Sequence, residues 1–570
     1  MAEPSVAAET AARACAACHK NKRRCDKILP TCSLCKRFRR PCDYSWLTNG
    51  TDDSASLRSR ISELEQQVAR LSNQTPSTLS SFEDTTAAPM LHDASSKLYL
   101  KSLFLDSGLS EYCVKSNPVV NVSIPQEVFT AIGDQLAVDH IKTQYFQLMN
   151  TWMPILNESK LDRLINHGSK NGLRPDTALL LLSMKLILEV PTNNDAERSP
   201  LYVIAKKFCY TLDELYTLTK MQATLIIAVY ELGHAIFPAA YTSIGTCASH
   251  GITLGLHNKV APQMLQTPRS WVDWEERQRA WWYVVILDRY VAAGSDQRSL
   301  FTEDPTIDTP IPVDDEAWKH GEIVPPERLS LASATSMQVS PFARVAQASH
   351  LLGRVIKHCN DQTSTPAFML EDMELLHQTT SSILSLLTEN SAVAGAFYLA
   401  QSLCLSAQMK LSDHHSCDSF SENMPIDIET AALLRECMDR SIAKMKENCS
   451  RVVSFAQVLM KLGQDSHLVC LSPLVLHCLY RTSVALSWMA METSNEQYLI
   501  GKTICVNALQ MMNTRWKAAG TVFINRSPIV SCFNSNRRDR SLPRAFKCSR
   551  AGNGTRDFLG EQSNAVHSTP

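Results

Sequence analysis

The sequence predicts a mainly α-helical protein with a small cysteine-rich module near its N-terminus, a short coiled coil and a large all-α body. Six of the 19 cysteines in the 570 residues lie between Cys15 and Cys42. A short heptad pattern of Leu, Ile and Val follows at residues 57–72. Residues 125–519 form long apolar stretches with few strand signals, a length that can bury a large core.

The cysteine-rich module contains an internal repeat. The pattern C-x2-C-x6-C occurs twice, as Cys15, Cys18 and Cys25 and then as Cys32, Cys35 and Cys42. Zinc bound by thiolates takes four ligands in a tetrahedron, so two ions have about eight ligand places. Six sulfurs fill these places if two of them bridge both ions. The repeat therefore predicts a binuclear Zn2S6 cluster with two Zn2+ ions per chain.

Three disulfides are the alternative use of six cysteines. Such frameworks persist in oxidising compartments, and the first residues, MAEPSVAAETAARA, lack the charged start and apolar core of a signal peptide. We therefore favour metal binding. The other cysteines show no motif spacing and are predicted to be reduced core residues.

Positive charge is concentrated in the same module. Residues 13–45 contain ten Lys or Arg and two Asp, a net charge of +8, whereas the whole chain has a net charge of −1. A charge run is often only a solvated face, but its coincidence with a metal-folded module favours phosphate binding. The pattern predicts a nucleic-acid partner, and the resemblance given next implies that this partner is double-stranded DNA.

The module resembles the DNA-binding domain of the fungal zinc binuclear cluster (Zn2Cys6) transcription factors. The resemblance extends from Cys15 to Tyr44 and includes Pro30 between the halves and Asp26 after the third cysteine. It implies that Cys15 and Cys32 bridge the two ions. It further implies that Cys18 and Cys25 complete one site, and Cys35 and Cys42 the other.

The segment between Cys18 and Cys25, HKNKRR, is predicted to be a short helix, which in this family lies in the DNA major groove. The resemblance places Lys22 where a family lysine contacts the base edges of a CGG triplet. His19 and Asn21 depart from the usual residues at their positions. Lys20, Arg23 and Arg24 are interpreted as mainly phosphate contacts.

The heptad pattern consists of Leu57, Ile61, Leu64, Val68 and Leu71. Leu at d with Ile or Val at a favours a parallel two-stranded coiled coil, and Arg60 can meet Glu65 of a second copy. A plain amphipathic helix is the alternative, since the pattern is little over two heptads. The family carries its dimerisation element at this place, which favours a homodimer.

The body resembles the fungal-specific transcription factor domain, or middle homology region. Four local patterns support this: Tyr145-Phe146 with Trp152, Pro154 and Ile155; Gly255-Leu256-His257; Glu275-Glu276-Arg277 with Arg279, Trp281, Trp282, Asp288 and Arg289; and Ile307-Asp308-Thr309 with Pro312, Asp314 and Asp315. We expect structural ion pairs at Asp288–Arg289 and Glu276–Arg279, and a buried core helix around residues 280–287.

The body shows no catalytic motif: G-x-S-x-G, the phosphate-binding loop, H-E-x-x-H and G-x-G-x-x-G are absent from the sequence. His250 and His257 are interpreted as core or surface histidines rather than as a metal pair. No apolar stretch approaches the roughly 20 residues of a membrane span, so no membrane partner is expected. Helical bundles can form small-molecule cavities, but the sequence does not locate an effector site.

These observations predict a nuclear, sequence-specific transcription regulator (for RNA polymerase II) that is not an enzyme. It would bind CGG-type triplets as a homodimer, act with the transcription machinery, and control a metabolic pathway such as a secondary-metabolite gene cluster. A zinc-dependent RNA-binding or architectural scaffold protein is the alternative. The expected domains are a disordered N-terminus (1–14), the Zn2Cys6 domain (15–45), a linker (46–56), the coiled-coil helix (57–72), a flexible tether (73–124), the regulatory body (125–519) and a disordered tail (520–570).

Overall fold

The computed structural model divides the chain into two units, residues 1–91 and 92–570. It describes residues 11, 14–20, 24–38 and 40–44 of the first unit. In the second it describes residues 122–520, except 192–195, 262, 296, 322–323, 334–338, 389–393, 417–427 and 466–469. The predicted linker, coiled coil and tail lie outside the described residues, except Gly520, as do nearly all of the predicted N-terminus and tether.

The first unit contains two short helices, α1 (Ala16–Lys20) and α2 (Ser33–Arg37). The sequence predicts a helix between Cys18 and Cys25, whereas the observed helix α1 starts earlier, at Ala16, and is described only to Lys20. Arg24 and Cys25 lie outside any helix, and residues 21–23 are not described. Among the described residues, the core of the module consists mainly of its cysteines.

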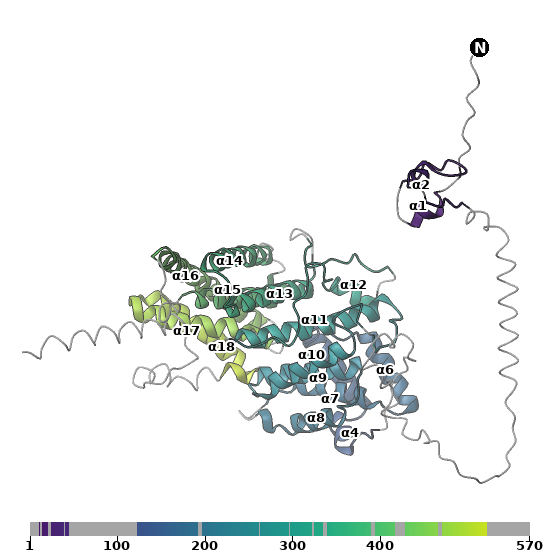
Figure 1. Cartoon of the computed structure of the whole chain (residues 1–570). Helices are drawn as coiled ribbons and strands as arrows, with labels where there is room; N and C mark the ends of the chain where they lie inside the picture. The colour runs from purple at the N-terminus through teal and green to yellow at the C-terminus, as the bar shows by residue number, and fades with distance from the viewer. Residues whose placement is uncertain are drawn as a thin grey trace, which may run out of the picture. The chain divides into compact units, whose positions relative to one another are not determined.

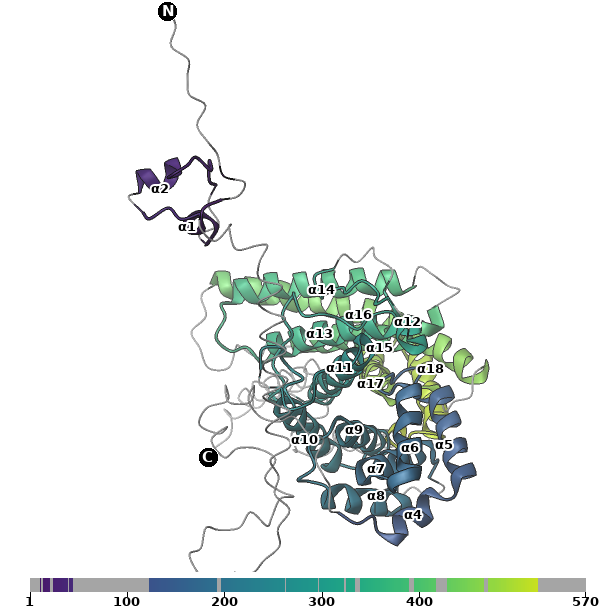
Figure 2. The same cartoon turned by 90° about the vertical axis from the view of Figure 1, so that its right-hand side faces the viewer.

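The second unit is a helical body, as predicted. Among the described residues of this unit the β-structure is limited to an isolated bridge between Pro310 and Ser330. Figures 1 and 2 show stacked helices, with α14 and α16 at one end, α4 and α8 at the other, and α9, α10 and α11 between them. Across the described part of the chain, no helix combines the length and the apolar character needed to cross a bilayer.

The first half of the body is built around two helices with apolar residues on every side. α7 and α9 are buried along nearly their whole length, so neither shows the single apolar stripe of a surface helix. Pro175 in the first turn of α7 and the Thr217 side chain, which accepts a hydrogen bond from the backbone N–H of Lys220, mark where these helices begin. The helices are α4 (Gln126–Ile132), α5 (Gln135–Leu148), α6 (Glu158–Asn171), α7 (Pro175–Leu188), η4 (Ala196–Arg198), α8 (Pro200–Thr211), α9 (Leu218–Gly233), α10 (Ala239–Thr253) and α11 (Trp271–Ala293).

The second half packs around α15, which is buried along almost its whole length. α13 and α16 lie against it, and α17 and α18 pair with each other. The elements are α12 (Asp315–His320), α13 (Pro341–Asn360), α14 (Pro366–Thr388), η5 (Ala394–Phe397), α15 (Tyr398–His414), α16 (Ile428–Asp465), η7 (Pro473–Val475), α17 (Leu476–Thr493), α18 (Glu496–Asn513) and η8 (Lys517–Ala519).

Helix α11 carries buried charges that join it to the segment after it. The predicted Asp288–Arg289 pair is confirmed, with Nη1 2.7 Å from Oδ2. The predicted Glu276–Arg279 pair is wrong. Arg279 instead contacts Glu275, one turn earlier, and Asp315, while Glu276 pairs with Lys160. The predicted core helix at residues 280–287 is buried except for Trp281, which is partly exposed.

Candidate metal centre and nucleic-acid interface

Each half of the cysteine repeat places one C-x2-C pair at the start of a short helix. Cys15 immediately precedes α1 and Cys18 lies within it; Cys32 is the N-cap of α2 and Cys35 lies within that helix. The Cys35 backbone N–H donates a hydrogen bond to the Cys32 sulfur at 3.4 Å. All four side chains are at most 3% exposed, so the sulfurs form the interior of the module.

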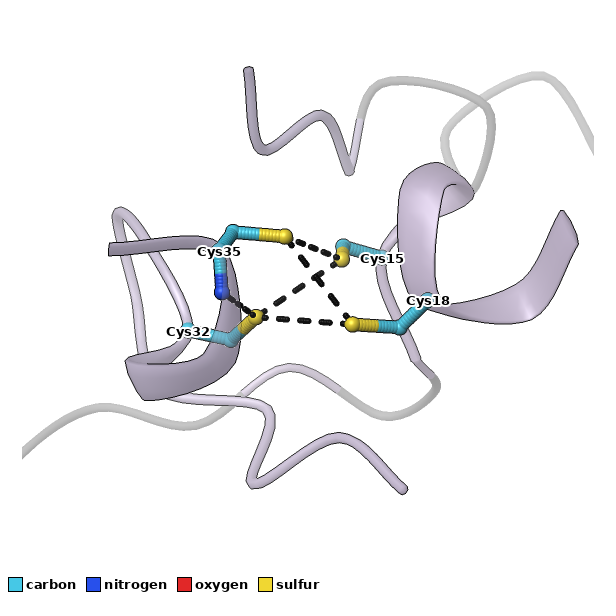
Figure 3. Close-up of side chains that lie close together, drawn as sticks. All are labelled: Cys15, Cys18, Cys32 and Cys35. Atoms are coloured by element: carbon cyan, nitrogen blue, oxygen red, sulfur yellow. Dashed lines mark hydrogen bonds between the residues drawn. The ribbon is translucent and has the colours of Figure 1, made fainter. Parts of the chain in front are cut away.

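The four sulfurs face one another across a small space (Figure 3). The Cys15 sulfur lies 3.8 Å from that of Cys32 and 3.6 Å from that of Cys35. The Cys18 sulfur lies 3.7 Å from that of Cys32 and 3.9 Å from that of Cys35. In a regular tetrahedron with Zn–S bonds of about 2.3 Å, neighbouring sulfurs are about 3.8 Å apart. Both the donor chemistry and the spacing therefore fit zinc.

The other two cysteines lie beside this group of four. The Cys25 sulfur is within 4.8 Å of the Cys32 sulfur and forms a second ligand group with it and Asp26. The Cys42 sulfur accepts a hydrogen bond from the Cys32 backbone N–H at 3.3 Å. Cys32 is therefore the cysteine common to all of these contacts.

These four cysteines form no disulfide bonds in the structure. Sulfur–sulfur separations of 3.6 to 3.9 Å are far longer than the roughly 2.05 Å of a disulfide bond. All six cysteines of the module are free thiols in the structure.

Without a metal, the thiols of Cys18 and Cys35 hold their protons at neutral pH. Burial raises the pKa of Cys18 well above its ordinary value and that of Cys35 to about 12. Backbone and side-chain hydrogen bonds from Cys35 lower the pKa of Cys32 against the opposing effect of burial. Zinc binds thiolates, so metal binding must release protons here and is favoured as the pH rises.

Asp26 connects the two halves of the module. Both of its carboxylate oxygens accept the Ser33 backbone N–H at 3.1 Å, at the first residue of α2. Hydrogen bonds from Ser33 lower the pKa of this exposed carboxyl. A carboxylate at a helix N-terminus satisfies a backbone donor that has no partner within the helix. Asp26 thereby holds the loop after Cys25 against α2.

Basic side chains cover the outside of the module. Of the predicted DNA contacts, His19, Lys20 and Arg24 are exposed, while Asn21, Lys22 and Arg23 lie outside the described residues. The net charge of the module includes the basic residues of the second helix, but no individual DNA contact was predicted there. There the guanidinium groups of Arg37 and Arg40 lie 6.0 and 5.6 Å from the ring centre of Phe38, which is 57% exposed. The run KRFRR was the available signal for this second basic surface.

Among the described residues, each group of three or more metal-ligating side chains lies in this module. His250 is buried in α10, whereas His257 is exposed. The structure thus brings four of the six predicted zinc ligands into one group and places the other two next to Cys32.

Comparison with known proteins agrees with this site. Residues 13–49 match the fungal Zn(2)-Cys(6) binuclear cluster domain, and residues 143–421 match the fungal specific transcription factor domain. The chain therefore belongs to the fungal Zn(2)-Cys(6) transcription factor family. It is a zinc-containing, DNA-binding transcription regulator and not an enzyme, and this membership implies a nuclear location.

The chain is similar to three curated relatives. It is 43% identical over 182 residues to the transcription factor BOA15 of Botryotinia fuckeliana, which covers 32% of this chain and 99% of the relative. It is 23% identical over 353 residues to the notoamide biosynthesis cluster transcriptional coactivator notQ' of Aspergillus versicolor. This match covers 57% of this chain and 62% of the relative. It is 23% identical over 359 residues to the Zn(2)-C6 fungal-type transcription factor FTF1c of Fusarium oxysporum f. sp. lycopersici. This match covers 55% of this chain and 38% of the relative.

Proposed function

We propose that this chain binds CGG-type DNA triplets as a homodimer and regulates transcription through its helical body. The observation that supports this most is the group of four sulfurs at tetrahedral spacing beneath exposed basic residues. A metal-folded module of this size can present a rigid basic surface to the phosphate backbone. We also propose the domain boundaries given above, with the module at 15–45, the coil at 57–72 and the body at 125–519.

The proposed cluster holds two zinc ions. Cys15 and Cys32 would bridge them, as the family resemblance implies, and the closeness of Cys32 to both Cys25 and Cys42 supports its part in this assignment. Cys18 and Cys25 would complete the coordination of one ion, and Cys35 and Cys42 would complete that of the other. The role of zinc is structural: it fixes the loops and the two helices that carry the basic side chains.

The function is tested by competition binding with the full-length chain. We expect a duplex with two CGG triplets to compete far better than a scrambled duplex or an RNA of equal length, since base contacts add to a shared phosphate term. Equal competition by all three would instead support an RNA-binding or architectural protein.

Lys22 is proposed to read the triplet. Lys22→Ala should weaken binding to a CGG duplex by about 1–3 kcal/mol and leave non-specific binding nearly unchanged, because a lysine can donate to guanine O6 and N7. Arg24→Ala is the matched control, since a lost phosphate contact weakens both complexes and flattens the salt dependence. Fluorescence anisotropy at several salt concentrations measures both effects. If the two variants behave alike, Lys22 makes no base contact.

The proposed dimer rests on the heptad pattern from Leu57 to Leu71. Leu64→Asp places a charge on the apolar seam and should abolish the extra affinity that a second triplet provides, while single-triplet binding stays intact. Ser62→Asp, which adds the same charge outside the a and d positions, should keep the extra affinity. Sedimentation and binding to one-triplet and two-triplet duplexes provide the readout. Retention of the full gain by Leu64→Asp would exclude the coil as the dimer element.

We further propose that the chain acts with the transcription machinery to control a metabolic pathway, namely a secondary-metabolite gene cluster. The support is similarity to a relative named as a coactivator of a biosynthesis cluster. Genome-wide mapping of bound sites tests this. Enrichment at one contiguous group of biosynthetic genes is expected, and sites scattered without such a group would argue against it.

A further inference from the structure

A cavity of about 450 Å³ lies in the helical body, outside the cysteine module. One wall comes from the end of α9, the turn after it and the start of α10. The other walls come from the end of α11, from η7 and α17, and from α18 and η8. Its volume falls within the range of about 300–1,000 Å³ that holds small organic ligands. The wall formed by residues 473–519 lies beyond the region matched by the family domain, 143–421.

Most of the cavity surface is apolar. It is lined by aliphatic side chains and by aromatic rings, among them Ile236, Leu476 and Leu509 with Phe237 and Tyr241. An apolar lining of this kind stabilises a ligand with a hydrophobic, flat skeleton through burial of its surface.

The one buried carboxylate in the lining is already neutralised. Glu231 is fully buried, and its oxygens accept hydrogen bonds from Lys206 at 2.6 Å, Tyr202 at 2.8 Å and Ser243 at 2.6 Å. The hydroxyl of Tyr290 donates to the Pro473 carbonyl at 3.2 Å. These groups therefore have partners within the protein and do not require a ligand.

His477 has an acceptor without a partner. Its Nδ1 atom is buried and meets no hydrogen-bond partner among the described residues. Burial lowers the pKa of His477 to about 3, against a smaller opposing effect of the Ala293 backbone, so the ring is neutral at physiological pH. His477 therefore adds no positive charge to the cavity, and its buried Nδ1 presents almost no surface to a ligand.

Arg298 supplies an uncompensated positive charge. Its guanidinium carbon lies 4.3 Å from the ring centre of Tyr241 and 5.9 Å from that of Phe237, and Phe237 is 68% exposed. In the part of the chain that the structure describes, no carboxylate forms an ion pair with Arg298. Stacking on two rings holds the planar guanidinium in place while its N–H donors remain available, a geometry suited to a carboxylate or sulfonate.

We propose that this cavity is a binding site for a small organic anion with a flat apolar skeleton. The skeleton would lie among the aliphatic and aromatic side chains, and the anionic group would pair with Arg298. Because such a ligand contacts both α9–α11 and α17–α18, it would stabilise the packing of the two halves of the body. This site does not depend on the proposed DNA function, since binding is measured without DNA.

The probes are two molecules with the same skeleton. Anilinonaphthalene sulfonate carries an anion, and N-phenylnaphthylamine is its uncharged counterpart; both fluoresce when buried in an apolar site. We expect the full-length chain to bind one molecule of either probe saturably. Arg298→Gln should weaken binding of the sulfonate roughly tenfold, the low end for a charge-assisted hydrogen bond at a partly exposed site, and leave the neutral probe unchanged.

Arg328→Gln is the matched control, because the Arg328 guanidinium also lies over an aromatic ring, that of Trp274 at 6.0 Å, but outside the cavity. This variant should bind both probes as the wild type does. A second variant, Leu476→Trp, fills the cavity with a larger side chain and should weaken both probes together. The proposal is overturned if Arg298→Gln binds the sulfonate like the wild type, or if it weakens both probes equally. It is also overturned if the wild type shows no saturable binding.

Discussion

Cys32→Ala is expected to release all the zinc from the N-terminal module and to unfold it. The Cys32 sulfur lies 3.8 Å from that of Cys15 and 3.7 Å from that of Cys18, and it also belongs to the group with Cys25 and Asp26. Its loss removes a ligand from both proposed ions. Structural zinc contributes on the order of 10–16 kcal/mol to the folding of small zinc domains, so the module should not remain folded without it.

Zinc content and DNA binding of the full-length variant provide the readout. Cys470→Ala is the control, since Cys470 is a partly buried thiol of the body, outside the module. We expect the control to keep its zinc and its affinity for DNA. A Cys32→Ala chain that retained zinc and bound DNA normally would show that Cys32 does not bridge the ions.

Arg279→Met should destabilise the helical body by about 3–5 kcal/mol, the usual cost of removing one partner of a buried ion pair. Arg279 is fully buried and lies 2.9 Å from a Glu275 oxygen and 2.7 Å from an Asp315 oxygen. It also donates to the Val313 carbonyl at 2.8 Å and stacks on the ring of Trp318 at 4.2 Å. Methionine keeps much of the volume but leaves the buried Glu275 carboxylate without its cation.

Urea unfolding of the body, followed by circular dichroism, measures this loss. Arg440→Met is the control, because Arg440 pairs with Glu436 on α16 with both side chains 50% exposed. Exposed ion pairs four residues apart on a helix contribute about 0.3–0.5 kcal/mol to the free energy of unfolding. Similar losses in the two variants would mean that the Arg279 network does not hold α11 to the 313–315 segment.

The sequence predicts the module and the class of fold well because both depend on short-range patterns. The spacing of cysteines two and six residues apart restricts which sulfurs can meet, and the apolar helices of the body are visible in single stretches such as residues 280–287. The spacing could not show that Asp26 would accept the Ser33 backbone N–H and so join the two halves. That contact depends on the path of the loop between them.

Contacts between residues far apart in the chain could not be predicted from the sequence. Helix spacing alone does not decide between Glu276 and Glu275 as the partner of Arg279, because residues three and four apart both share a helix face. The choice of Glu275 is explained by Asp315 and Val313, which approach Arg279 from another segment. The cavity is a similar case, since its lining runs from Glu231 to Ala519 and no local pattern brings these residues together.

We propose that a cluster of two zinc ions makes this chain a CGG-specific DNA-binding protein. The most direct test of this proposal is a zinc titration of the metal-free full-length chain, with the anisotropy of a labelled CGG duplex as the readout. The account predicts that specific binding rises until two equivalents of zinc per chain are present and then stays constant. Full binding without zinc, or saturation at one equivalent, would contradict it.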